Sequence, residues 1–213
     1  MKSLNIFCAG SLAAFAALDA SPAFAQQDAL IVVVDRSGSM NDCFDSTGRT
    51  KWEEAIDRAR IAVQVPAIDR AYELWSFSGS SWTQHYTFAA GSALSTTQRQ
   101  DAMDLALDNL LAIGPGGATP LAGSVCASVD TLTSWAISEG GFPPPPLRIA
   151  LFSDGLENQT PTTDQCYGPA STTAYDPTNP DRGGLTPGSW EWKVLNKAIT
   201  GNANNPANPP VTV

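Results

Sequence analysis

The chain of 213 residues is long enough for one domain with a sizeable hydrophobic core, or for one domain and a tail. With 43% hydrophobic and only 15% charged residues, it is not a disordered chain. Its formal net charge of -9 repels phosphate groups, so nucleic acid and anionic membrane surfaces are poor partners and divalent cations are better ones.

The first 25 residues have the pattern of a secretory signal. Lys2 supplies a positive charge, an apolar run extends from Leu4 to Leu18, and Ala23-Phe24-Ala25 forms an A-x-A cleavage site. We therefore expect a mature chain that begins at Gln26 and is secreted, periplasmic or held at the cell surface. The apolar run is too short to span roughly 30 Å of hydrocarbon, and no other stretch reaches about 20 apolar residues. No transmembrane segment is expected.

The first half of the mature chain predicts strands and helices in alternation. A continuous apolar run from Ala29 to Val34 is typical of a strand buried on both faces of a parallel sheet. The capping box from Thr50 to Glu53 opens a helix that reaches about Val65. Short strands at 72–77 and 83–88, joined by residues 78–81, predict a hairpin.

The alternation continues along the chain. A second capping box opens a helix from Ser95 to about Ile113, and a third helix should run from Pro120 to about Ser138. A second buried strand covers residues 147–152. Strands that alternate with helices of more than ten residues predict an α/β domain with a mainly parallel sheet.

The last part of the chain is less regular. Residues 156–188 form a long polar segment rich in Pro, Thr and Gly, which is typical of a functional or disordered loop. A helix should follow from about Ser189 to Thr200, closed by Gly201. An Asn/Pro linker at 201–210 and the apolar end 211–213 complete the chain.

Three polar clusters come where an open α/β sheet binds its ligands, beyond the carboxyl ends of the strands. They are residues 35–40, residues 116–120 and residues 153–155. Together they offer two carboxylates and three hydroxyls, from Asp35, Ser37, Ser39, Thr119 and Asp154. Oxygen ligands without soft sulfur or imidazole favour a hard cation such as Mg²⁺ and disfavour zinc.

In order and spacing, Asp35-x-Ser37-x-Ser39, then Thr119, then Asp154 resemble the metal-ion-dependent adhesion site of von Willebrand factor A domains. The resemblance covers residues 28–155 well. It implies a doubly wound, mainly parallel sheet with one antiparallel edge strand, in a domain that extends over residues 26–213. In this family the sheet runs on to further strands and a final helix, so we expect either a fragment of a longer protein or a trimmed fold.

The resemblance also implies a function. Mg²⁺, or Mn²⁺ or Ca²⁺, would be held by the five oxygen side chains, with Ser37 and Ser39 as direct ligands and Thr119 bound directly or through water. Asp35 and Asp154 would often act through water. The open coordination position would then bind an Asp or Glu carboxylate of a protein partner, without catalysis. A structural part in a larger surface assembly is the alternative, and a metal-assisted hydrolase is a weaker one, because no nucleophile or base accompanies the site.

The cysteines leave their pairing open. Cys8 leaves with the signal, and Cys43, Cys126 and Cys166 remain, of which two can pair in an oxidising compartment. We favour Cys43–Cys166, because both lie in loops that should meet at one end of the sheet, whereas Cys126 has the position of a buried helix residue.

Other titratable residues near these clusters have simpler interpretations. His85 is the sole histidine and falls within a predicted strand, so we expect a packing or surface residue. Asp42, Asp45 and Glu157 could hold a second cation, but solvated loop carboxylates are the more frequent case.

Overall fold

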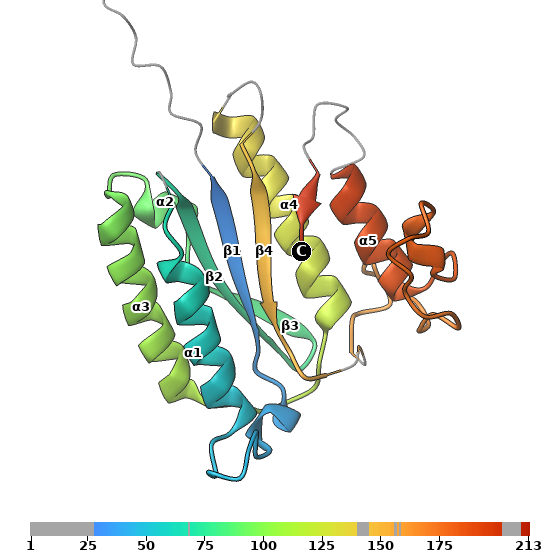
Figure 1. The fold of residues 1–213 in the computed structure, drawn as a ribbon, viewed down its shortest axis with the longest axis horizontal. Coiled ribbons are helices and arrows are strands. Elements are labelled where there is room, and N and C mark those ends of the chain that lie inside the picture. The colour runs from blue at the N-terminus through green and yellow to red at the C-terminus, as the bar shows by residue number, and fades with distance from the viewer. Residues whose placement is uncertain (1–27, 68, 140–144, 156, 158, 202–209) are drawn as a thin grey trace, which may run out of the picture.

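The computed structural model describes residues 28–67, 69–139, 145–155, 157, 159–201 and 210–213. The predicted signal with its cleavage site before Gln26 and almost all of the predicted linker lie outside these residues. Within them, a five-stranded sheet has the order β3-β2-β1-β4-β5, with helices on both faces (Figure 1). No helix in the described ranges is long and apolar enough to cross a membrane.

The sheet is built around β1 (Ala29–Asp35), which is parallel to β2 (Ala71–Ser78) on one side and to β4 (Leu147–Phe152) on the other. The edge strand β3 (Ser81–Tyr86) is antiparallel to β2, and β5 (Val211–Thr212) pairs in parallel with the start of β4. This architecture confirms the predicted α/β fold with a mainly parallel sheet and one antiparallel edge strand.

The hairpin between β2 and β3 is tighter than the sequence predicts. The strand expected at residues 83–88 begins at Ser81 and ends at Tyr86. Gly79 has a φ of 68°, a conformation that glycine adopts without steric cost, and this allows a two-residue turn in place of the expected four-residue connection.

The helices begin and end close to the predicted positions. The two capping boxes that start at Thr50 and Ser95 are both formed. Ser189 caps the last helix, and Gly201, with a φ of 62°, ends it. The helices are α1 (Lys51–Gln64), α2 (Phe88–Gly91), α3 (Thr96–Ile113), α4 (Leu121–Glu139) and α5 (Trp190–Thr200), with two short 3-10 turns, η1 (Gly38–Asn41) and η2 (Arg182–Gly184).

The core has one layer on each face of the sheet. Ile31 and Val33 of β1 belong to the layer that α4 and α5 cover, while Val32 and Val34 belong to the layer under α1 and α3. Successive side chains of a strand point to opposite faces, so a central strand needs apolar residues at every position. This explains why β1 is a continuous apolar run, and it makes β1 the rigid support for the loop that follows Asp35.

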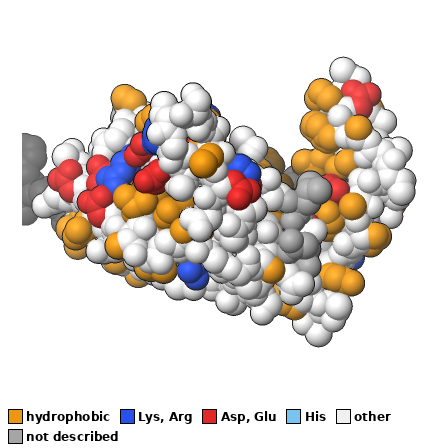
Figure 2. Space-filling model, turned by 90° about the horizontal axis from the view of Figure 1, so that it is seen from below, with side chains coloured by type: hydrophobic (Ala, Val, Ile, Leu, Met, Phe, Trp, Pro, Cys, Tyr) orange, Lys and Arg blue, Asp and Glu red, His pale blue; other side chains and the backbone are white. Residues whose placement is uncertain are grey.

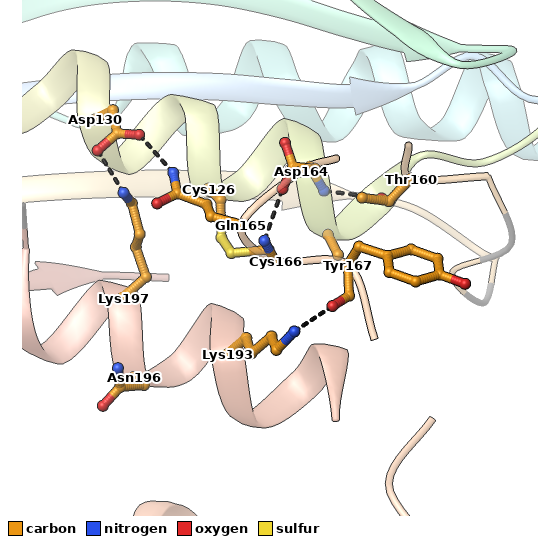
Figure 3. Close-up of a disulfide and its surroundings, with 12 residues drawn as sticks. Cys126, Asp130, Thr160, Asp164, Gln165, Cys166, Tyr167, Lys193, Asn196 and Lys197 are labelled. Atoms are coloured by element: carbon orange, nitrogen blue, oxygen red, sulfur yellow. Dashed lines mark hydrogen bonds and ion pairs between the residues drawn. A yellow bond between two sulfur atoms is a disulfide. The ribbon is translucent and has the colours of Figure 1, made fainter. Parts of the chain in front are cut away.

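The favoured Cys43–Cys166 pairing is wrong. Cys126 of α4 is joined to Cys166, and Cys43 is exposed and free (Figure 3). Cys126 is buried, as predicted, but it lies in a small cluster with Ala122 and with Cys166 of the loop after β4, against which the partly buried Trp190 packs. Cys43 instead lies in the loop before α1, where its main chain forms an isolated antiparallel β-bridge with Thr50.

The long polar loop after β4 is packed against the domain in its described part. Asp130 of α4 accepts a hydrogen bond from Gln165 at 2.8 Å and pairs with Lys197 of α5 at 2.5 Å (Figure 3). Further along, the main-chain N–H of Ser171 donates to Glu191 at 2.8 Å. Together with the disulfide, these contacts fix the loop between α4 and α5, so it is a structural part of this side of the domain.

Candidate metal-binding site

The polar clusters meet at the end of the domain where β1 and β4 finish, which lies at the bottom of Figure 1. Main-chain hydrogen bonds join the loops there. Gly38 N–H donates to the Gly117 carbonyl at 2.8 Å, and Gly116 N–H donates to the Arg36 carbonyl at 2.7 Å. The loop before α4 is therefore held against the loop after β1 by the backbone.

Four of the five predicted ligands form one chain of contacts. The carboxylate of Asp35 accepts a hydrogen bond from Ser37 N–H at 2.7 Å, and the hydroxyls of Ser37 and Ser39 are 3.2 Å apart. Ser39 donates to Oδ1 of Asp154 at 2.9 Å. Residues separated by 115 positions in the sequence are thus in direct contact.

Thr119, the fifth predicted ligand, lies beside the same chain of contacts. It is buried, two residues before α4. A Cβ placed on Gly155 would be 3.2 Å from the Thr119 hydroxyl and 3.3 Å from Oδ2 of Asp35. Thr119 and Asp35 therefore both approach Gly155 closely, and a side chain at position 155 would crowd both of them. The structure brings all five predicted residues to one place.

Asp35 is the buried carboxylate of the site, and its surroundings change its pKa. It is fully buried, and its Oδ2 accepts a hydrogen bond from Ser153 at 2.6 Å. Burial raises the pKa of Asp35, the hydrogen bonds from Ser153 and Ser37 oppose that rise, and the nearby charge of Asp154 adds to it. Ser153 has a role that the sequence did not reveal, although it stands next to Asp154 in the third cluster.

Lys51 is the second residue that sequence reasoning missed. Its ammonium group forms an ion pair with Oδ2 of Asp154, and it is 3.5 Å from the carboxylate of Asp42. The hydrogen bond to Asp154 raises the pKa of Lys51. The residue is the first of α1, directly after the cap Thr50, so only the placement of that helix end beside the site reveals its role.

The residues present suit a small hard cation. Octahedral ligands at about 2.0–2.1 Å from Mg²⁺ are about 2.9 Å from their neighbours. The separations of 3.2 Å between the Ser37 and Ser39 hydroxyls and 2.9 Å between Ser39 and Asp154 are close to that value. In the described residues, no three His, Cys, Asp or Glu side chains gather to hold a metal, so the oxygen set depends on hydroxyl groups.

The other candidate residues have structural contacts. The Nε2 atom of His85 is 2.8 Å from the Ser76 hydroxyl, and Ser76 is only 2% exposed. A buried serine is out of reach of a substrate carbonyl, so this pair does not form a usable nucleophile and base. Glu157 accepts a hydrogen bond from Ala122 N–H at 2.5 Å, at the start of α4. Asp45, which is exposed, accepts one from Thr47 N–H at 2.8 Å.

Comparison with known proteins gives similarity to solved structures alone. No family model and no curated protein matches this chain. The pilus adhesin SpaC from Lactobacillus rhamnosus GG is 16% identical over 63% of this chain and 16% of its own, with a TM-score of 0.41. The PilB minor pilin from Streptococcus sanguinis is 16% identical over 63% of this chain and 31% of its own, also with a TM-score of 0.41. The chain thus spans less than a third of the length of these structures.

Proposed function

We propose that this chain is a von Willebrand factor A-type domain that binds a divalent cation and uses it to bind a partner protein. Mg²⁺, Mn²⁺ or Ca²⁺ would be held by Asp35, Ser37, Ser39, Thr119 and Asp154. The observation that carries the proposal is the direct contact of Ser39 with both Ser37 and Asp154, which unites the loops after β1 and β4.

The chemistry of these side chains favours binding over catalysis. Asp35 already accepts hydrogen bonds from Ser37 N–H and from Ser153, so part of its negative charge is taken up within the protein. The remaining ligands are three neutral hydroxyls and one carboxylate, Asp154. A bound divalent cation would keep much of its positive charge and would accept a carboxylate from an Asp or Glu of the partner. This role needs no nucleophile or general base.

The disulfide supports a location outside the cytoplasm. Structural disulfides form and persist in secreted, periplasmic and cell-surface proteins and are rare in the cytosol. The bond between the buried residues Cys126 and Cys166 agrees with the secretory signal expected at residues 1–25. We propose that the domain acts in the periplasm, at the cell surface or as a secreted protein.

Thermal unfolding tests the metal site. A cation that binds only the folded chain adds about 2.7 kcal/mol at 100 times its Kd. For a domain of this size the melting temperature should then rise by roughly 5–10 °C in Mg²⁺ relative to EDTA. Asp154→Ala should abolish the rise, and Asp101→Asn, which removes an exposed carboxylate of α3, should retain it. If a calorimetric titration of wild type also detects no Mg²⁺, Mn²⁺ or Ca²⁺ binding, the proposal fails.

A second measurement separates partner binding from a structural use of the metal in a surface assembly. Only partner binding predicts that a short peptide with one Asp binds in Mg²⁺ and is released by EDTA. The same peptide with Asn in place of Asp is the control. Metal binding without any Asp-dependent peptide binding would favour the structural role.

A further inference from the structure

A cavity of about 490 Å³ opens directly beside Asp154. Its walls include the aromatic rings of Phe44 and Phe152 and the two cationic side chains of Lys51 and Arg58. Figure 2 shows this end of the molecule, where acidic and basic side chains lie next to each other with hydrophobic ones close by. Glu54 and Asp154 also line the cavity, so each of the two cations has a carboxylate beside it: Arg58 has Glu54 and Lys51 has Asp154.

Lys51 depends on Asp154 for its main partner. Its other anionic contact, Asp42, is at 3.5 Å and is 70% exposed, so water screens that pair strongly. A divalent cation bound to Asp154 would repel the ammonium group and take over its principal counter-charge. Lys51 would then be left at the mouth of the cavity with a weak partner.

Arg58 and Phe44 also line the cavity and contact each other. The guanidinium of Arg58 lies 5.8 Å from the centre of the Phe44 ring, and its Nε donates to Glu54 at 2.6 Å. The Phe44 ring is 47% exposed, so part of its apolar surface is open to a partner. This wall could accept an apolar side chain without losing its own contacts.

We propose that Lys51 and this cavity form the second half of the partner-binding site: Lys51 exchanges Asp154 for the partner's acidic side chain when the cation binds, and the cavity takes an apolar side chain next to that acid. The proposal rests on the proposed function. The occupant is an acidic segment with a neighbouring apolar residue, because the metal-loaded site would present the cation and Lys51 beside the apolar side chains of Phe44, Leu151 and Phe152, while Arg58 stays paired with Glu54. Charge complementarity therefore selects an anionic segment over a neutral or basic one.

Replacement of Lys51 should change the affinity for Mg²⁺ and the affinity for an acidic peptide in opposite directions. Because Lys51 competes with the cation for Asp154, Lys51→Met should strengthen Mg²⁺ binding, by about fivefold for a partly exposed ion pair. Because Lys51 contacts the partner, the same change should weaken acidic-peptide binding at saturating Mg²⁺ by a similar factor. A residue with a merely structural role would not move the two constants in opposite directions.

Calorimetric titration of the full chain gives both constants. The probes are Mg²⁺ alone and the peptides acetyl-Gly-Asp-Leu-Gly-amide and acetyl-Gly-Asp-Gly-Gly-amide. Arg60→Met is the matched control, since it removes one cation from the same helix at a residue paired with Asp108. Lys51→Arg keeps the charge and should restore peptide binding. Phe44→Ser should abolish the preference for Leu over Gly and leave the Mg²⁺ affinity unchanged.

The outcomes distinguish this inference from the function on which it rests. If wild type binds no Mg²⁺, the proposed function fails and this inference fails with it. If wild type binds Mg²⁺ and the peptides, but Lys51→Met behaves like Arg60→Met in both titrations, the inference alone is overturned. Circular dichroism of each variant shows whether a lost affinity reflects a lost fold, and Lys51→Arg then decides the case, since loss of peptide binding in a folded Lys51→Arg also counts against the proposal.

Discussion

Removal of the Cys126–Cys166 disulfide should destabilise the domain strongly. The bonded residues are 40 positions apart, and closing a loop of that length lowers the entropy of the unfolded chain by an amount equivalent to about 4 kcal/mol. For a domain of this size, a loss of that magnitude lowers the melting temperature by roughly 8–16 °C. The double variant Cys126→Ala/Cys166→Ala should show this loss in thermal and urea unfolding.

The free cysteine supplies the control. Cys43 is exposed and unbonded, so Cys43→Ala should unfold like wild type. Peptide mapping of the unreduced chain should show Cys126 linked to Cys166 and Cys43 open to alkylation. The reasoning would be refuted if Cys43→Ala lowered the melting temperature as much as the double variant, or if the map linked Cys43 to Cys166.

Two further predictions concern a buried acid and a site loop. Burial raises the pKa of Glu73 from its ordinary 4.5 to about 7, so the folded chain retains a proton that the unfolded chain releases, and stability falls as pH rises from about 4.5 to 7. In urea unfolding, the free energy of unfolding of Glu73→Gln should therefore be about 3 kcal/mol higher than that of wild type above pH 7, and the two should be equal below pH 4.5. Gly117 has a φ of 89°, and a Cβ there would be 2.8 Å from Gly79 N, so Gly117→Ala should weaken Mg²⁺ binding and lower the melting temperature. Gly116→Ala, where a Cβ meets nothing within 4 Å, should have neither effect.

The fold was predictable because its signals are local. The apolar run of β1 and the capping boxes at Thr50 and Ser95 depend on residues only a few positions apart, and all three have the predicted structure. The site followed from the same signals. Parallel strands end at one edge of a sheet, so polar residues placed just after β1 and β4 had to meet.

Contacts between distant segments were not predictable in this way. The pairing of Cys126 depends on how the loop after β4 folds back over α4, and no local pattern encodes that path. The contact of Lys51 with Asp154 joins residues 103 positions apart and depends on where α1 begins relative to β4. The wrong disulfide pairing and the missed Lys51 contact both concern the positions of loops and helix ends, which the periodicity of a sequence does not specify.

The main-chain contacts that hold the candidate site together bear on the role that we propose for a cation. Three main-chain hydrogen bonds of 2.7–3.0 Å join the loops after β1, between β2 and β3, and before α4. They are donated by Gly38 N–H to the Gly117 carbonyl, by Gly116 N–H to the Arg36 carbonyl and by Gly79 N–H to the Ala118 carbonyl. None of these bonds needs a metal ligand. The protein itself therefore holds these loops together, and under the proposed function a cation would spend little binding energy on ordering them. Under the proposed function, the energy of metal binding would then remain available for the partner, which is what a binding site requires and a purely structural metal would not need.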